Sequence, residues 1–190
     1  AVDPHDEAKT VDEDGRVWRD YVIAKPQAMS RVFGPLGRFK LHEAKNNNAD
    51  WEIDFEKPRV EVWEYVANRY LSFALDFNFD FMRGDMSHVQ MRPEGTPENP
   101  DLYYDIHKYI KHFVRQHKPS FGYFAESFLA PPNEMAYGVE EEHLEGSDTD
   151  STLGDLQSMV VGSPRFIAEF ARYHELAQTR SFAPNFTIMT

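Results

Sequence analysis

Two acids, Asp85 and Glu126, stand at the ends of two strand-like segments, residues 77–85 and 121–126. Side chains alternate along a strand, so Arg83 and Asp85 lie on one face, as do Phe124 and Glu126. Parallel strands need a crossover of about a dozen residues or more, and the stretch between the two acids holds a loop and a helix. We therefore expect the two carboxylates to converge at one rim of a parallel sheet.

Two converging carboxyl groups are suited to hydrolysis of a glycosidic bond. Retaining enzymes hold the two carboxyl groups about 5 to 5.5 Å apart. One is ionised and attacks the anomeric carbon, and the other is protonated and gives its proton to the leaving oxygen. We expect Arg83 to lower the pKa of Asp85, and apolar neighbours to raise the pKa of Glu126. The alternative is that Arg83 and Asp85 form a plain salt bridge and Glu126 is a solvated strand end.

The sequence at these positions resembles the α-amylase family of retaining glycoside hydrolases, which are (β/α)8 barrels. Residues 83–88, an Arg-x-Asp followed by His88, are similar to the family's fourth-strand motif, and residues 121–128 resemble its fifth-strand motif. Residues 50–55 and 58–60 are similar to the run that enters the third helix of the family. The resemblance implies that Asp85 is the nucleophile, Arg83 orients it, and Glu126 is the acid/base.

The resemblance is incomplete at both ends. The family's Asp-x-x-x-x-His segment and its seventh-strand His-Asp, which supplies a third carboxylate, have no counterpart in the sequence. Barrels of this type typically need about 250 residues, so the fold class predicted is α/β, a partial (β/α) barrel incomplete at both ends. Residues 1–50 are expected to form a loop-rich excursion with short strands, and residues 51–190 the partial barrel.

The same gap leaves the function open between alternatives. The chain is either an α-amylase-like enzyme that hydrolyses or transfers α-glucosidic bonds, or a non-catalytic carbohydrate-binding or structural fragment without the third carboxylate. A substitute acid from the long loops, such as Glu134 or Asp148, is a third possibility.

Prolines and apolar periodicity predict the helices that position these acids. Pro58, Pro100 and Pro164 each precede a stripe of apolar residues with a 3.6-residue period, typical of a helix that begins at proline. Short apolar runs near residues 77, 121 and 186 predict strands, and a further short strand is expected at 17–24. Strand–helix–strand order favours a parallel sheet, with residues 127–150 as a loop at its active rim.

Further residues are candidates for contact with a sugar. Aromatic rings stack on the apolar faces of pyranoses, and the candidates nearest the acids are Trp18, Tyr123, Phe128 and Tyr137, although these rings could simply pack the loops. His88 follows Asp85 closely enough to donate to a sugar hydroxyl, although a lone loop histidine is more often a surface residue.

The composition of the chain limits the classes of molecule that it is expected to bind. The formal charge of −12 disfavours nucleic acid and anionic membrane surfaces, and it is compatible with an oligo- or polysaccharide substrate. The chain has no Cys, which removes thiolate chemistry and Cys-ligated metals.

Phe77, Phe79 and Phe81 would be open to water in an incomplete barrel, so association into a homo-oligomer through sheet edges is expected. The first residues are acidic and unlike a signal peptide, but they could follow a cut, so both a cytoplasmic and a secreted location stay open.

Metal-binding patterns are weak. The spacing of His107, His112 and His117 does not align them on one helical face, so a zinc site is not expected. Asp148 and Asp150 resemble the start of a calcium loop that lacks its bidentate Glu, so no cofactor is predicted, although calcium remains compatible. Residues 140–142, all Glu, are predicted to be a solvated loop.

Overall fold

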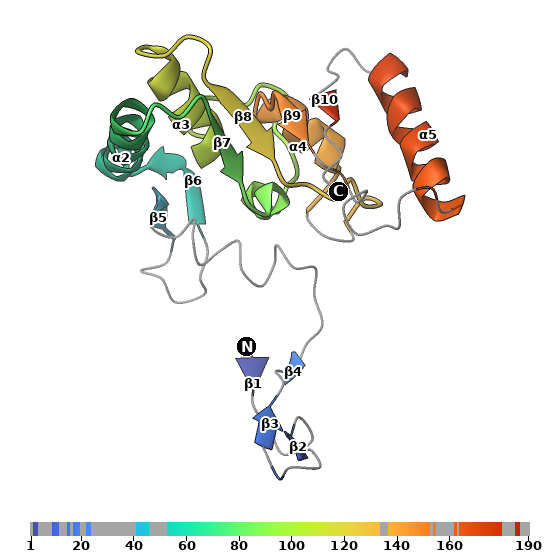
Figure 1. Cartoon of the computed structure of the whole chain (residues 1–190). Coiled ribbons are helices and arrows are strands. Elements are labelled where there is room, and N and C mark those ends of the chain that lie inside the picture. Colours follow the sequence, from blue (N-terminus) through green and yellow to red (C-terminus); the bar gives the residue numbers. More distant parts are fainter. Residues whose placement is uncertain are drawn as a thin grey trace.

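The chain is a mixed α/β protein in the computed structural model (Figure 1). The described residues are 2–3, 9–11, 15, 17–19, 22–23, 41–45, 53–133, 137–152, 154, 162, 164–179 and 185–186. The helices among them are α2 (Val60–Asp76), α3 (Ile106–Arg115), α4 (Glu140–Gly146) and α5 (Pro164–Thr179).

The main sheet is parallel, and its strands follow one another in space in the order of the sequence. It consists of β7 (Phe81–Gly84), β8 (Gly122–Ala125), β9 (Ser151–Thr152) and β10 (Asn185–Phe186). The connections between successive strands contain α3, α4 and α5. Arg83 pairs with Phe124, and Phe124 with Ser151, so the carboxyl ends of β7 and β8 lie at the same rim.

The remaining strands form two-stranded antiparallel sheets. β1 (Val2–Asp3) pairs with β4 (Val22–Ile23), and β2 (Lys9–Val11) pairs with β3 (Val17–Arg19). The single strand predicted at 17–24 is therefore two strands, β3 and β4. β5 (His42–Ala44) pairs with β6 (Ile53–Pro58), and this pairing joins residues on both sides of the boundary expected near residue 50.

Helix α2 begins two residues later than predicted, because Pro58 is the last residue of β6. Arg59 bridges the two elements, and its backbone N–H donates to Leu41 O at 2.8 Å. Trp63 Nε1 donates to the same carbonyl at 2.6 Å, so the helix is fixed to the β5–β6 sheet at its first turn. The buried residues Trp63, Ala67 and Ala74 recur at helical spacing and face the core.

Helix α3 begins at Ile106, not at Pro100 as predicted. The Asp105 side chain accepts from His107 N at 2.6 Å and caps the helix, whereas Tyr104 N bonds back to Asp101 O in a preceding turn. An Asp at the N-cap satisfies a free N–H of the first turn. Helix α5 begins at Pro164, which confirms its predicted start.

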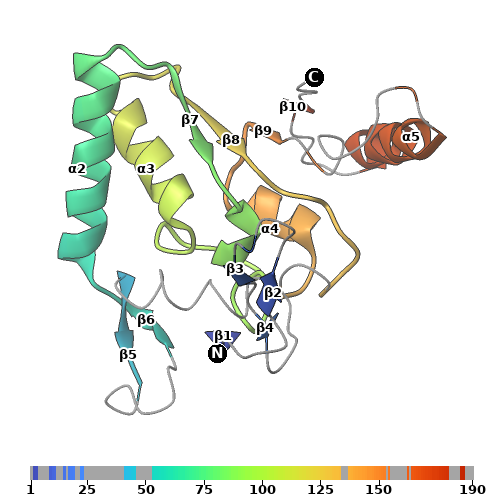
Figure 2. The same cartoon turned by 60° about the horizontal axis from the view of Figure 1, so that its bottom comes forward.

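The core lies on one side of the β7–β8 pair, and α2 and α3 run side by side there (Figure 2). Met82, Tyr123 and Ala125 are buried on that side. On the opposite face Phe81 is 66% exposed, and Phe79, which precedes β7, is 54% exposed.

The strand predicted at 77–85 is shorter than expected, because α2 continues to Asp76 and β7 begins only at Phe81. β7 is one of the two edge strands of the described sheet, and the exposed aromatic residues lie on and beside it. The association expected from such an edge stays a prediction. No helix in the described part of the chain is long and apolar enough to cross a membrane.

Candidate active site at the carboxyl ends of β7 and β8

One guanidinium nitrogen contacts both of the acids singled out by the sequence. Arg83 Nη2 lies 3.2 Å from Asp85 Oδ1 and 2.8 Å from Glu126 Oε1. Because both carboxylates reach the same nitrogen, the two strand ends bring them within a few ångströms of each other. The side chains differ in exposure: 76% for Asp85 and 10% for Glu126.

Backbone hydrogen bonds hold Glu126 in place. Its N–H donates to Gly84 O at 2.9 Å, and its carbonyl accepts from Ser87 N and Ser87 Oγ, each at 2.8 Å. Its Oε2 accepts from Met86 N at 2.8 Å. Met86 has a φ of 47°, in the left-handed region, so the chain turns sharply after β7 to aim this N–H at the carboxylate.

The electrostatics of the pair differ from the prediction. The hydrogen bond to Glu126, followed by desolvation and the negative charge of Glu126, raises the pKa of Asp85, and Arg83 opposes this only in part. Arg83 does act to lower the pKa of Asp85, as expected, but the expectation that the net shift is downward is wrong. The sequence argument considered Arg83 with Asp85 alone, whereas the guanidinium lies closer to Glu126.

His88 lies inside the protein, near enough to Glu126 for that charge to affect it, and its side chain is not exposed as a surface residue or a sugar ligand would be. Its ring packs edge-on against Phe128, with centroids 5.3 Å apart. Neither ring nitrogen has a hydrogen-bond partner among the described residues. Burial, and then the neighbouring His143, lower the pKa of His88 to about 4, against a smaller opposing effect of Glu126.

The aromatic candidates are not all brought to the site. Phe128 is half-buried and reaches it through His88. Tyr123 is 1% exposed and stacks on His107 of α3, with centroids 5.3 Å apart, so its ring belongs to the core. Tyr137 is half-buried beside Gly138, whose N–H donates to the Asn133 side chain. Trp18 lies in β3, and its side chain is outside the described part.

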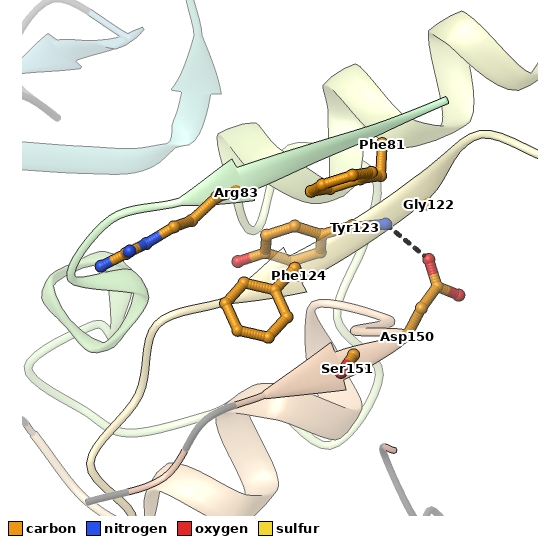
Figure 3. Close-up of a pocket in the computed structure, with 7 residues that line it drawn as sticks. All are labelled: Phe81, Arg83, Gly122, Tyr123, Phe124, Asp150 and Ser151. Atoms are coloured by element: carbon orange, nitrogen blue, oxygen red, sulfur yellow. Dashed lines mark hydrogen bonds between the residues drawn. The ribbon is translucent and has the colours of Figure 1, made fainter. Parts of the chain in front are cut away.

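A largely apolar cavity of about 350 Å³ lies on the open face of the sheet. Figure 3 shows that Phe81 and Phe124 project into it from neighbouring strands, with Arg83 at one end and Asp150 at the other. The dashed bond in the figure runs from Tyr123 N to an Asp150 oxygen at 2.7 Å. The cavity thus adjoins the acid pair through Arg83.

The loop acids considered as substitutes do not join the pair in the described region. Asp148 Oδ2 lies 3.0 Å from both Lys111 Nζ and His112 Nε2 of α3. Asp150 is held by Lys111 at 3.1 Å and by Arg115 at 3.1 Å. Glu134 lies outside the described residues. Within the described ranges, no group of three or more His, Asp and Glu side chains could hold a metal ion.

The structure also shows a buried acid that the sequence did not indicate. The prediction of a solvated loop at 140–142 is wrong, because these residues form the first turn of helix α4 and Glu140 is only 2% exposed. Its Oε2 accepts from Ser127 Oγ, from Phe128 N at 3.1 Å and from Leu129 N at 2.8 Å. Burial raises the pKa of Glu140, although these three hydrogen bonds oppose the increase.

Comparison of the chain with models of protein families, with curated proteins and with solved structures finds no match.

Proposed function

We propose that the chain is part of an α-amylase-like glycoside hydrolase that acts on α-glucosidic bonds of oligo- or polysaccharides by a retaining mechanism. The observation that carries the proposal is the contact of Arg83 with both Asp85 and Glu126 at the ends of adjacent parallel strands. Two carboxyl groups held this closely fit the spacing of about 5 to 5.5 Å used by retaining enzymes better than the wider inverting spacing.

The fold is consistent with the proposal. Parallel strands in sequential order, with helices in the connections, are the repeating unit of a (β/α) barrel, and we propose that residues 51–190 form part of one. In such barrels the active site lies at the carboxyl ends of the strands, which is where Asp85 and Glu126 stand.

In the proposed reaction, Asp85 attacks the anomeric carbon while Glu126 gives its proton to the departing glycosidic oxygen. A water molecule then attacks the anomeric carbon and gives a proton to Glu126, while the bond between Asp85 and the sugar breaks. The more exposed Asp85 is the more accessible acid, whereas Glu126 is largely buried and its charge reaches His88. The hydrogen bond to Glu126 raises the pKa of Asp85, which opposes ionisation of the proposed nucleophile, so the two roles are assigned by a direct test.

Covalent trapping supplies that test. A 2-deoxy-2-fluoro glycosyl fluoride slows breakdown of the covalent intermediate, and peptide mass spectrometry then locates the labelled residue. Label on Asp85 supports the proposed roles, whereas label on Glu126 reverses them.

Isosteric substitutions test the pair independently. Asp85→Asn and Glu126→Gln should each lower turnover of an α-glucan or maltose by at least about 10³-fold, because each removes the ionisable group without altering side-chain volume. Glu142→Gln is the control, because Glu142 is exposed and lies on α4. Wild-type turnover in either acid variant would remove that residue from the mechanism.

A non-catalytic carbohydrate-binding or structural role is the second candidate. It is favoured by the position of Asp148, which is engaged with α3 and not with the acid pair. Sugar binding measured by calorimetry, with no turnover and no covalent label, would support this candidate over the first.

A further inference from the structure

The three residues that follow Glu126 are held from two sides. Their donors, Ser127 Oγ, Phe128 N and Leu129 N, all bond to one oxygen of Glu140 in α4. On the other side, two residues of α5 hold the carbonyls: Arg172 Nη2 donates to Leu129 O at 2.8 Å, and Tyr173 Oη donates to Phe128 O at 3.3 Å.

This arrangement fixes an otherwise irregular segment. Residues 127–129 belong to no helix or strand, and Leu129 has a φ of 51°, a left-handed conformation that is uncommon outside glycine. A backbone in such a conformation persists only where surrounding contacts determine it. Glu140 supplies contacts to all three residues, while the sheet holds Glu126 on the other side through Gly84 O.

We propose that Glu140 is a positioning residue, which sets the geometry of the Glu126 carboxyl group by fixing residues 127–129. The proposal rests on the proposed glycosidase function and assigns a residue that the resemblance does not include. Its physical basis is that rotation of the backbone directly after Glu126 would displace the carboxyl group from Arg83 and Met86 N. A displacement of about 1 Å at a catalytic group is enough to lower a rate by about 10²-fold.

The hydrogen bonds of the Glu140 carboxyl group are suited to this positioning role. Its Oε1 is buried and has no hydrogen-bond partner among the described residues, so only Oε2 carries the three bonds. An amide could keep the acceptor at that position, whereas an alkyl side chain of similar size could not. Glu140→Gln should therefore preserve the segment, and Glu140→Leu should release it. Glu142→Leu is the matched control, because it makes the same change at an exposed position of α4.

Leaving-group dependence separates positioning from a general loss of folded protein. A glycosyl fluoride needs little proton donation, whereas a maltooligosaccharide needs the acid fully. For Glu140→Leu we expect kcat on the oligosaccharide to fall by about 10-fold or more and kcat on the fluoride by less than about 3-fold. Glu140→Gln and Glu142→Leu should stay near wild type on both. Where the wild-type protein turns over both substrates, an equal fall on both in Glu140→Leu, or no fall on either, would overturn the proposal.

A measurement without turnover keeps the inference distinct from the proposed function. Carbon-13 NMR of labelled glutamate side chains follows the titration of Glu126, assigned by its loss in Glu126→Gln. Loss of the Arg83 and Met86 N contacts, both of which favour the ionised carboxylate, should move the titration of Glu126 in Glu140→Leu to higher pH. Glu142→Leu should leave it unchanged. If the titration moves but no variant has glycosidase activity, the positioning role stands and the proposed function fails. If the titration does not move, Glu140 does not position Glu126.

Discussion

Acidification should destabilise the protein through His88 specifically. The pKa of this histidine falls from 6.5 to about 4 in the folded state, chiefly because the ring is buried and also because His143 lies nearby. A folded pKa below the unfolded pKa means that folding favours the neutral ring. The stability linked to this group is therefore complete above pH 6.5 and is lost as the pH falls toward 4.

The size of the effect follows from the shift. One pKa unit corresponds to about 1.4 kcal/mol, so full protonation of His88 should cost about 3 kcal/mol of unfolding free energy. At pH 5 the unfolded histidine is almost fully protonated and the folded one is largely neutral, so the loss there should be about 2 kcal/mol.

His88→Leu removes the titration at little other cost. Neither ring nitrogen has a described hydrogen-bond partner, and leucine has a similar volume, so stability at pH 7 should change by less than about 1.5 kcal/mol. Urea unfolding of the whole chain at pH 7, 6 and 5, followed by tryptophan fluorescence, gives the pH dependence. Between pH 7 and 5 the variant should lose about 2 kcal/mol less than wild type.

The control is His117→Gln, since His117 is exposed and solvated. This variant should show the wild-type pH dependence. Equal losses between pH 7 and 5 in His88→Leu and wild type would refute the reasoning, because another group would then carry the acid sensitivity.

Two further predictions concern the packing of β7 and β8 against α3. Gly84→Ala should lower the unfolding free energy by about 1 to 3 kcal/mol, because the new Cβ would lie 2.8 Å from the Tyr123 ring and 3.0 Å from the His107 ring. Chemical denaturation measures this loss. An unchanged denaturation midpoint would show that the stacked Tyr123 and His107 rings move aside without cost. Asp150→Asn should destabilise the protein more than Lys111→Met. The first change leaves the Lys111 ammonium, which is 1% exposed, with one anionic partner fewer, whereas the second leaves the carboxylates of Asp148 and Asp150, which water can reach. A larger loss of unfolding free energy for Lys111→Met in the same assay would contradict this account.

The sequence was sufficient where local pattern determines structure. Arg83 of β7 and Asp85, the residue directly after β7, contact each other as alternation predicts, and Pro164 begins α5 as predicted. Helix α3 was misplaced because Pro100 is a good first residue for a helix, yet the better cap is Asp105, whose carboxylate reaches His107 N. Two compatible start signals within six residues give no local reason to choose between them, and the tertiary contacts of the turn decide.

The chemistry of the site depended on contacts that no local pattern encodes. Three consecutive acids at 140–142 are typical of a solvated surface, and only the long-range meeting of Glu140 with residues 127–129 makes the first of them a buried acceptor. The pKa of Asp85 likewise depends on Glu126, forty-one residues away in sequence, more than on Arg83, two residues away. The spacing of the two strand ends predicts that the acids meet, but the direction of the Asp85 pKa shift depends on the contact with Glu126, and that contact is a property of the folded pair.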